Sequence, residues 1–150
     1  MLTATVNRVR DNTSDCVNQA IDQATEARVR RISQGGPHAI QQRLDELDRE
    51  WDIERLLETV APTLSLTGLA LGVLRDRRFL LVPLVVQAFF LQHAIQGWCP
   101  PMPVLRRLGV RTAEEISQER NALKALRGDY QSAEMKQPNS AQRAVEAARS

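Results

Sequence analysis

The chain has 150 residues, with 20 Lys and Arg against 18 Asp and Glu, and a formal net charge of +2. That length allows one domain and excludes a large multidomain enzyme. The small net charge and the lack of a dense basic run exclude a nucleic-acid partner. Residues 60–98 hold only four charged side chains, and the flanks hold the other 34. We therefore expect two apolar segments between polar helical arms.

The first polar arm covers residues 1–36. Small or apolar residues recur there at three- and four-residue steps, namely Val6, Val9, Thr13, Cys16, Ala20 and Ala27. This predicts a weakly amphipathic helix over 3–33, either solvated and in need of a partner or forming a short coiled-coil seam. Gly35-Gly36-Pro37 ends it. The N-terminus has no apolar run typical of a secretory signal.

Residues 37–59 are predicted to form an amphipathic helix that leads into the apolar region. Its apolar stripe consists of Ile40, Leu44, Leu47 and Trp51, and acidic and basic residues fill the other face. This helix either lies on a membrane surface or packs against another helix. The acidic face argues against strong binding to anionic lipid.

Two apolar segments occupy the centre of the chain. Val60 to Leu74 is 15 residues without a charge, about 22 Å of helix against a hydrocarbon core of about 30 Å. Phe79 to Trp98 is 20 residues without a charge, which is spanning length. Only residues 75–78 separate them, so we expect an all-α protein with a two-helix transmembrane hairpin over 60–98, flanked by amphipathic cytoplasmic helices. A buried soluble hairpin is the alternative, but the arms lack matching apolar surface.

The first apolar segment carries a stripe of small residues at steps of four, three and four: Ala61, Ser65, Gly68 and Gly72. Small residues let helix backbones approach closely in lipid. We expect helix packing through this face, either within the hairpin or between chains, and a homo-oligomer is the expected assembly.

The second half of the second segment is polar, with Gln87, Gln92, His93 and Gln96. Polar groups in hydrocarbon need partners. His93, Gln96 and Cys99 follow at three-residue steps, so we expect one face that leads to the membrane edge. This face, with Gln92, is either a small polar site with a thiol or a set of interhelical hydrogen bonds beside an interfacial cysteine.

The edges of the hairpin carry residues suited to the membrane boundary. Trp51 and Trp98 fit interfacial anchors, and the tip arginines Arg75, Arg77 and Arg78 can reach the far headgroups. Five arginines flank the terminal side against these three at the tip: Arg49, Arg55, Arg106, Arg107 and Arg111. This weakly favours cytoplasmic termini.

Beyond the hairpin, the prolines after Cys99 are expected to end the second helix and to favour extended backbone. Thr112 to Glu115 reads as a capping box, which predicts a helix over 113–127 in the region 99–128. Residues 129–150 are predicted to be disordered.

Chemical motifs are absent from this pattern. We find no phosphate loop, nucleophile elbow, dinucleotide fingerprint or His-rich metal set. Cys16 and Cys99 lie far apart and form no disulfide framework or zinc spacing. The sequence therefore predicts no catalytic residue, no metal and no cofactor, and a lipid bilayer as the first partner.

Three stretches carry a resemblance to a known family: Glu50 to Arg55, Gly97-Trp98-Cys99-Pro100, and Leu105 to Thr112. Residues 50–128 resemble the YgaP-like transmembrane domain family of small bacterial inner-membrane proteins. The resemblance implies a two-helix membrane hairpin, multi-pass inner-membrane location, cytoplasmic termini and helix-mediated oligomers. That domain is often fused to a rhodanese, but this chain has no counterpart of the sulfurtransferase loop.

Three functions follow as hypotheses. The leading one is a non-enzymatic oligomerising anchor or scaffold whose N- and C-terminal helices bind another protein. The second is an accessory role in sulfur or thiol handling through Cys99, although the dipole at a helix C-terminus disfavours a thiolate. The third is a subunit of a small oligomeric transporter or channel, with Gln87, Gln92, His93 and Gln96 lining the pore.

Overall fold

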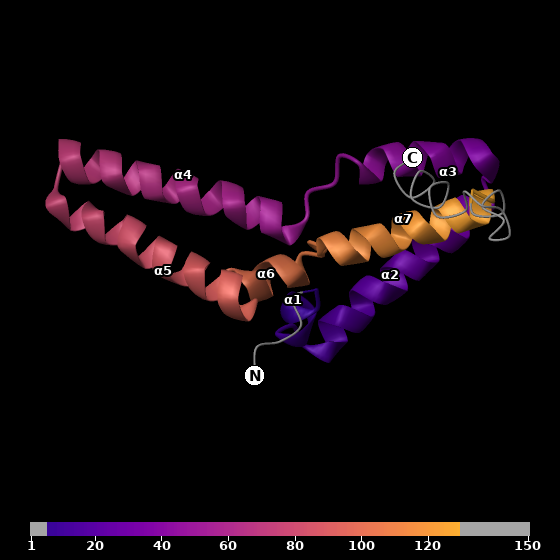
Figure 1. Ribbon diagram of the computed structural model, residues 1–150, viewed down its shortest axis with the longest axis horizontal. Helices are drawn as coiled ribbons and strands as arrows, with labels where there is room; N and C mark the ends of the chain where they lie inside the picture. Colours follow the sequence, from indigo (N-terminus) through magenta and orange to yellow (C-terminus); the bar gives the residue numbers. More distant parts are fainter. Residues whose placement is uncertain (1–5, 130–150) are drawn as a thin grey trace, which may run out of the picture. The chain divides into compact units, whose positions relative to one another are not determined.

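The computed structural model describes residues 6–129 (Figure 1), and over these residues the chain forms helices and no strand. The expected all-α class is confirmed for this part of the chain. Two compact units replace the single domain that the length allows. The first holds residues 6–22 and 51–114, and we call it the apolar unit; the second holds residues 23–50 and 115–129, and we call it the charged unit. The predicted disordered tail lies outside the described residues except for Asp129.

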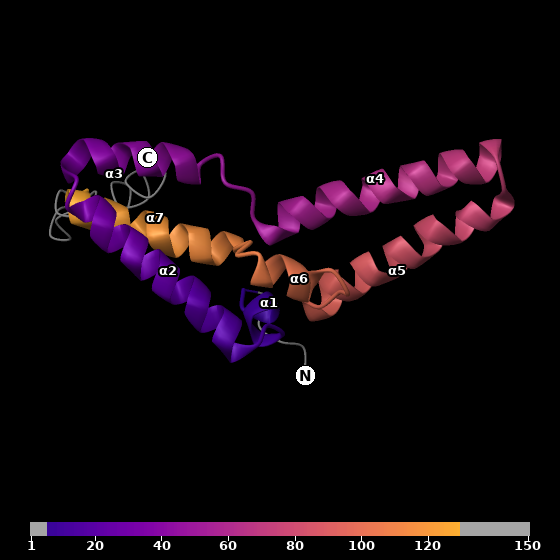
Figure 2. The same ribbon diagram turned by 180° about the vertical axis from the view of Figure 1, so that it is seen from behind.

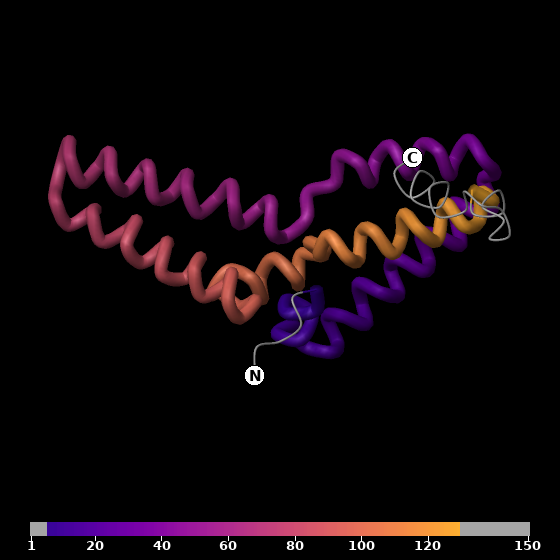
Figure 3. The backbone as a smooth tube through the Cα atoms, viewed as in Figure 1, coloured from indigo at the N-terminus to yellow at the C-terminus, as the bar shows by residue number. Residues whose placement is uncertain are grey.

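Two long helices dominate the apolar unit. Helix α4 spans Ile53–Leu74, the 3₁₀ helix η1 spans Arg77–Leu80 and α5 spans Leu81–Gln96. Figures 1 and 2 show α4 and α5 side by side, and Figure 3 shows the chain reversing direction between them. Both Ile53–Leu74 and Arg77–Gln96 are long and apolar enough to cross a membrane, by length and composition.

Two aspartates set where these helices begin. The Asp52 carboxylate accepts a hydrogen bond from the Arg55 backbone N–H at 2.7 Å, which satisfies a donor at the first turn of α4. The Asp76 carboxylate does the same for the Arg78 N–H at 2.9 Å at the start of η1. The expected helix over 37–59 is therefore wrong in its extent: α3 ends at Leu47, and Trp51 lies in the connection before α4 rather than on the α3 stripe.

Two short helices complete the apolar unit, α1 at Arg8–Asp11 and α6 at Met102–Arg107. The expected continuous helix over 3–33 is wrong, because the chain breaks at 12–14 before α2 begins. Extended backbone was also expected around residue 102, but the nearby prolines begin α6, where a missing N–H costs nothing. A buried apolar cluster joins these pieces: Val9, Ile53, Leu57, Cys99 and Met102.

The Arg106 side chain links α6 to the N-terminal segment. It is 1 % exposed and donates to Thr13 Oγ1 at 3.2 Å, to Asn18 Oδ1 at 3.0 Å and to the Val110 carbonyl at 3.0 Å. A buried guanidinium needs such acceptors because its charge cannot be removed. Arg106 therefore acts as a packing residue inside the apolar unit.

The charged unit contains α3 at Gly36–Leu47 and most of α2, Asp15–Ser33, and of α7, Ala113–Arg127. Helix α7 has the bounds that the capping-box pattern predicts. Its apolar core is contributed by all three helices: Val29, Ile32, Ile40, Leu44, Leu47, Ile116 and Leu123. This core gives the unit a packed interior of its own.

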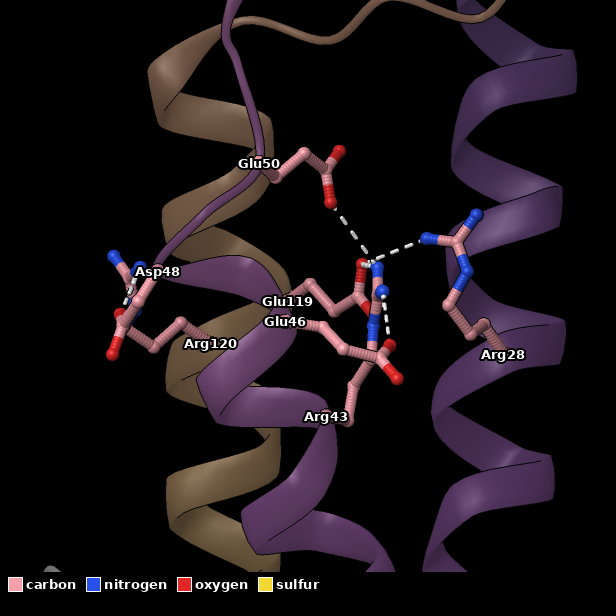
Figure 4. Close-up of polar contacts among 7 residues, drawn as sticks. All are labelled: Arg28, Arg43, Glu46, Asp48, Glu50, Glu119 and Arg120. Carbon is pink, nitrogen blue, oxygen red and sulfur yellow. Dashed lines mark hydrogen bonds and ion pairs between the residues drawn. The ribbon is translucent and has the colours of Figure 1, made fainter.

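A buried carboxylate lies beside that core. The Glu119 side chain is 0 % exposed, and it accepts hydrogen bonds from Arg28 Nη1 at 2.8 Å and from Arg43 Nε at 2.9 Å. Arg43 also contacts Glu46 and Glu50, and Figure 4 shows these groups meeting between α2, α3 and α7. The surrounding carboxylates raise the pKa of the Arg43 guanidinium further above its ordinary value, although burial acts against them. Paired in this way, the buried Glu119 charge ties three helices together.

Candidate functional site

The small-residue face of α4 packs within the chain. A Cβ atom built on Gly68 would lie 2.8 Å from Pro83 Cδ and 2.9 Å from Val82 Cβ. On Gly72 it would lie 2.5 Å from Leu80 Cδ2 and 3.2 Å from the Leu80 backbone nitrogen. Both glycines are therefore needed for the close approach of α4 to η1 and α5. Of the two alternatives that the sequence left open, the structure has the contact inside one chain.

The other small residues of the stripe follow the same face. Ala61 and Ser65 are buried, at 8 % and 7 % exposure. Ser65 Oγ accepts a hydrogen bond from Gln87 Nε2 at 2.8 Å, which crosses from α5 to α4. Gln87 is thus engaged by its own chain, and this contact gives no support to a pore lined by that residue.

A polar cluster lies where the start of α4 meets the end of α5. Glu54 Oε2 lies 3.0 Å from His93 Nε2, and Glu54 Oε1 accepts a hydrogen bond from Arg8 Nη2 at 2.9 Å. The His93 side chain is 1 % exposed, and its other ring nitrogen, Nδ1, is buried without a hydrogen-bond partner in the structure. A carboxylate only accepts hydrogen bonds, so Nε2 is the nitrogen that donates to Glu54.

Cys99 adjoins this cluster. The thiol is 3 % exposed and packs in the buried cluster with Ile53 and Leu57. It also lines an apolar groove of about 200 Å³ between α4 and α5, together with Leu64, Phe89 and Phe90. The second cysteine, Cys16, is exposed on α2. The two thiols therefore have opposite surroundings.

The expected polar and thiol site is brought together only in part. His93 and Cys99 are both buried, but Gln96 is exposed and Gln92 is only partly buried. The expected common helical face over these residues is wrong, because α5 ends at Gln96 and Gly97 takes a left-handed conformation with φ 76°. A Cβ on Gly97 would lie 2.6 Å from the Arg8 carbonyl oxygen, so only glycine fits there.

The expected anchors lie in different surroundings. Trp51 is 46 % exposed, with the Arg55 guanidinium 4.7 Å from its ring centre. Trp98 is partly buried against the Val9 and Ile53 cluster. The tip arginines Arg75, Arg77 and Arg78 are all exposed.

Sequence reasoning missed Glu54 and Arg8. Glu54 was named only within the Glu50 to Arg55 stretch that carries the resemblance, although an acidic residue at the start of an apolar helix, opposite a helix that contains a histidine, was a usable signal. Nothing in the pattern could place Arg8, which lies 46 positions before its partner. Between residues 6 and 129, no group of three or more His, Cys, Asp or Glu side chains is arranged to hold a metal ion.

The chain matches no family model, no curated protein and no solved structure.

Proposed function

We propose that this chain is an integral membrane protein in which α4 and α5 cross the bilayer as an antiparallel hairpin and the charged unit serves as a cytoplasmic platform that binds another protein. It works as a non-enzymatic anchor or scaffold. The observation that supports this most is the exposure of the long helices. Only 28 % of the apolar window of α4 and 6 % of that of η1 and α5 is buried. The core helix of a soluble protein would be mostly buried instead.

The size of the exposed surface strengthens this argument. The exposed large apolar side chains of α4 include Leu64, Leu66, Val73 and Leu74, and those of α5 include Leu81, Leu84, Leu91 and Ile95. Apolar area left in water costs about 25 cal/mol per Å². An apolar surface extending along two adjacent helices is typical of contact with lipid or with another protein.

Polar groups on this surface are satisfied within the helix. The hydroxyls of Thr59, Thr63 and Thr67 form a stripe along α4, and each donates to the carbonyl four residues earlier at 2.7 to 2.9 Å. In hydrocarbon an unpaired hydroxyl would be costly, and this bonding removes the cost. The stripe therefore suits a lipid-facing helix.

Contacts at the base of the pair support a common side for the N-terminal segment and the end of α5. Asn12 Nδ2 donates to the Gln96 carbonyl at 2.8 Å, and Arg8 binds Glu54 at the start of α4. Arg106 and Arg111, counted earlier as flanking charges, are buried at 1 % and 3 % exposure. Without these two buried residues, three arginines flank the hairpin on the terminal side and three lie at its tip, so the charge count favours neither orientation. We assign the terminal side to the bacterial cytoplasm from the resemblance to the YgaP-like family.

Fractionation with topology mapping tests the proposal. The protein should remain in carbonate-washed membranes and dissolve only in detergent. In a Cys99→Ser background, Cys16 should react with an impermeant maleimide only after the cells are lysed. In a chain with Cys16→Ser, Cys99→Ser and Arg77→Cys, the tip thiol should react in intact spheroplasts. Release by carbonate, or protection of the tip thiol, would contradict the hairpin.

We expect the homo-oligomer to use a face other than the glycine stripe, because Gly68 and Gly72 contact η1 and α5 of their own chain. We expect the detergent-solubilised protein to keep its oligomeric mass when Gly68 is replaced by Ile, even though the chain itself is destabilised. Light scattering with correction for bound detergent measures this mass. A switch to monomer on this substitution would move the stripe to an interface between chains.

A further inference from the structure

Helix α6 has apolar side chains on two of its sides. On the inner side, Met102 is 0 % exposed and Leu105 packs against the buried apolar cluster of the unit. On the outer side, Val104 and Leu108, the residue that follows α6, are 57 % and 75 % exposed. These two residues are four positions apart, so they share one face of the helix. The proposed function makes no use of this outer face.

Two contacts show the level of α6 along α4. Near the beginning of α6, Pro101 lines an apolar groove together with Val60 and Leu64 of α4. Beyond its end, the Arg111 carbonyl accepts a hydrogen bond from the Ile53 backbone N–H at 2.9 Å. Helix α6 therefore lies alongside about the first two turns of α4. Figures 1 and 2 show it near that end of α4.

This level is the boundary of the proposed membrane hairpin. The apolar helix begins at Ile53, and Trp51 lies just before it with 46 % of its side chain exposed. An exposed indole is typical of the level at which lipid headgroups meet acyl chains. In a bilayer crossed by α4 and α5, the outer face of α6 would therefore lie at the depth of the headgroups and the first part of the acyl chains.

The same part of α6 carries a positive charge. Arg107 is exposed, and no carboxylate among residues 6–129 forms an ion pair with it. A guanidinium binds a phosphate through parallel N–H groups. Its long apolar stem lets the charge reach the headgroups while Val104 and Leu108 lie deeper. An arginine beside two apolar side chains thus matches the chemistry of a phospholipid, which places a phosphate above an acyl chain.

Helix α3 does not offer such a face. The sequence left open whether its apolar stripe lies on a membrane surface or packs against another helix. Ile40, Leu44 and Leu47 are only 4 %, 6 % and 1 % exposed, and they pack in the core of the charged unit. The structure therefore has the second alternative for α3, and the exposed apolar face belongs to α6.

We propose, building on the membrane hairpin proposed above, that α6 is a membrane-boundary segment that binds anionic phospholipid. Val104 and Leu108 contact the upper part of the acyl chains in the leaflet where α4 begins. Arg107 pairs with the headgroup phosphate of the same lipids. The protein thus binds the bilayer through a third element besides α4 and α5, and this element selects for headgroup charge.

The test measures the depth of α6 in phospholipid vesicles that contain the full chain. A nitrobenzoxadiazole label is attached to Leu108→Cys or, separately, to Val104→Cys, in a chain with Cys16→Ser and Cys99→Ser. Both labelled positions are exposed, so the label should not disturb packing. We expect lipids with a doxyl group near the start of the acyl chain to quench both labels more strongly than lipids with a doxyl group near its end. Iodide in the water should quench both labels weakly.

Two further positions separate the role of α6 from the hairpin itself. A label on Leu91→Cys of α5 should be quenched by doxyl lipids, and a label on Leu126→Cys of α7 should be quenched by iodide alone. Both side chains are exposed, at 61 % and 56 %. A lack of lipid quenching at position 91 would contradict the hairpin, and the role of α6 with it. Lipid quenching at position 91 without any at position 108 would overturn the role of α6 alone.

Headgroup selection is measured with the label at position 108. The doxyl group is carried either by phosphatidylglycerol or by phosphatidylcholine, at the same fraction of the lipid. We expect phosphatidylglycerol to be enriched about 5-fold around α6, the equivalent of about 1 kcal/mol for one arginine near an anionic surface. Arg107→Gln should remove this preference, and Arg77→Gln, at the tip of the hairpin, should keep it. Equal quenching by both lipids in the chain that retains Arg107 would overturn its pairing with phosphate.

Coverage of the outer face by protein is a further outcome of the same measurement. If a second copy of the chain or another protein covered α6, the labels at positions 104 and 108 would be shielded from both doxyl lipids and iodide. Strong quenching by iodide would instead place α6 in water. Either result would overturn the proposal.

Discussion

The two compact units bury a carboxylate in different ways. In the charged unit, Glu119 is fully enclosed and two guanidinium groups bind it. In the apolar unit, Glu54 keeps 31 % of its side chain exposed and binds one guanidinium and one imidazole, whose far nitrogen has no partner. In the first arrangement, the buried carboxylate holds three helices together. The second pairs a partly exposed carboxylate with a buried imidazole at the end of α5.

The largest expected effect tests that contrast directly. Glu119→Gln would leave Arg28 and Arg43 facing a neutral amide, and removing one partner of a buried ion pair costs about 3–5 kcal/mol. Native-state hydrogen exchange of α3 and α7 measures the loss in the free energy of unfolding. Glu46→Gln is the matched control, because the Glu46 side chain is 54 % exposed and its contact with Arg43 is worth about 0–1 kcal/mol.

The same substitution at Glu54 should cost less stability than at Glu119. We expect about 1–3 kcal/mol, the range for a hydrogen-bonded group that loses its partner. An equal loss in the free energy of unfolding for both variants would contradict the proposed difference between Glu54 and Glu119.

The next effect concerns the glycine contact between α4 and η1 in the apolar unit. Gly72→Val would place a side chain against Leu80 and force α4 away from η1, which costs about 1–3 kcal/mol as overpacking does elsewhere. Unfolding by sodium dodecyl sulfate in mixed micelles measures the loss. Ala70→Val, at an exposed position of the same helix, should change stability by much less. Similar losses for both variants would mean that the glycine face is not the contact.

A smaller effect is expected at the hydrogen bond between the long helices. Gln87→Leu together with Ser65→Ala removes the 2.8 Å contact. Interhelical hydrogen bonds in membranes average about 0.6 kcal/mol in double-mutant cycles. The same micelle titration gives the coupling energy, and a value above about 2 kcal/mol would make this bond, rather than the glycine contact, the main tie between α4 and α5.

The smallest effect depends on pH. The Arg10 guanidinium, 2.8 Å away, lowers the pKa of the Asp22 carboxyl below its ordinary value of 3.8. Because the folded pKa is depressed, the contribution is complete above the unfolded pKa and is lost as the pH falls through the folded one. The Asp22 side chain is 45 % exposed, so the energy is within the range of about 0–1 kcal/mol. Carboxyl NMR titration should show the pKa return toward 3.8 in Arg10→Gln.

The presence of the main helices could be predicted from the sequence, but the residues at which they begin and end could be predicted less well. The apolar runs and the Thr112 capping box placed α4, α5 and α7 because hydrophobic pattern and caps are local signals. The break at Asp52 was missed because the apolar stripe continued across it, which favoured a longer helix. The turn at Gly97 was missed because three following prolines seemed a sufficient stop.

Only part of the candidate site could be predicted from the sequence. His93 and Cys99 were singled out by their chemistry and position. Their partners were not, since Glu54 is 39 positions before His93 and no periodicity connects them. Such a pairing is set by how helices dock, and that docking depends on glycine contacts whose register one sequence does not reveal.

The bond between Asn12 and the Gln96 carbonyl has a consequence for synthesis. The two residues are 84 positions apart, and at about 5–20 residues per second a ribosome needs about 4–17 s to make the stretch between them. During that delay α1 cannot dock at its native position, because the end of α5 has not yet been synthesised. The first helix of the chain is therefore among the last to dock, and its arrival closes the polar cluster around Glu54 only after both long helices have been made.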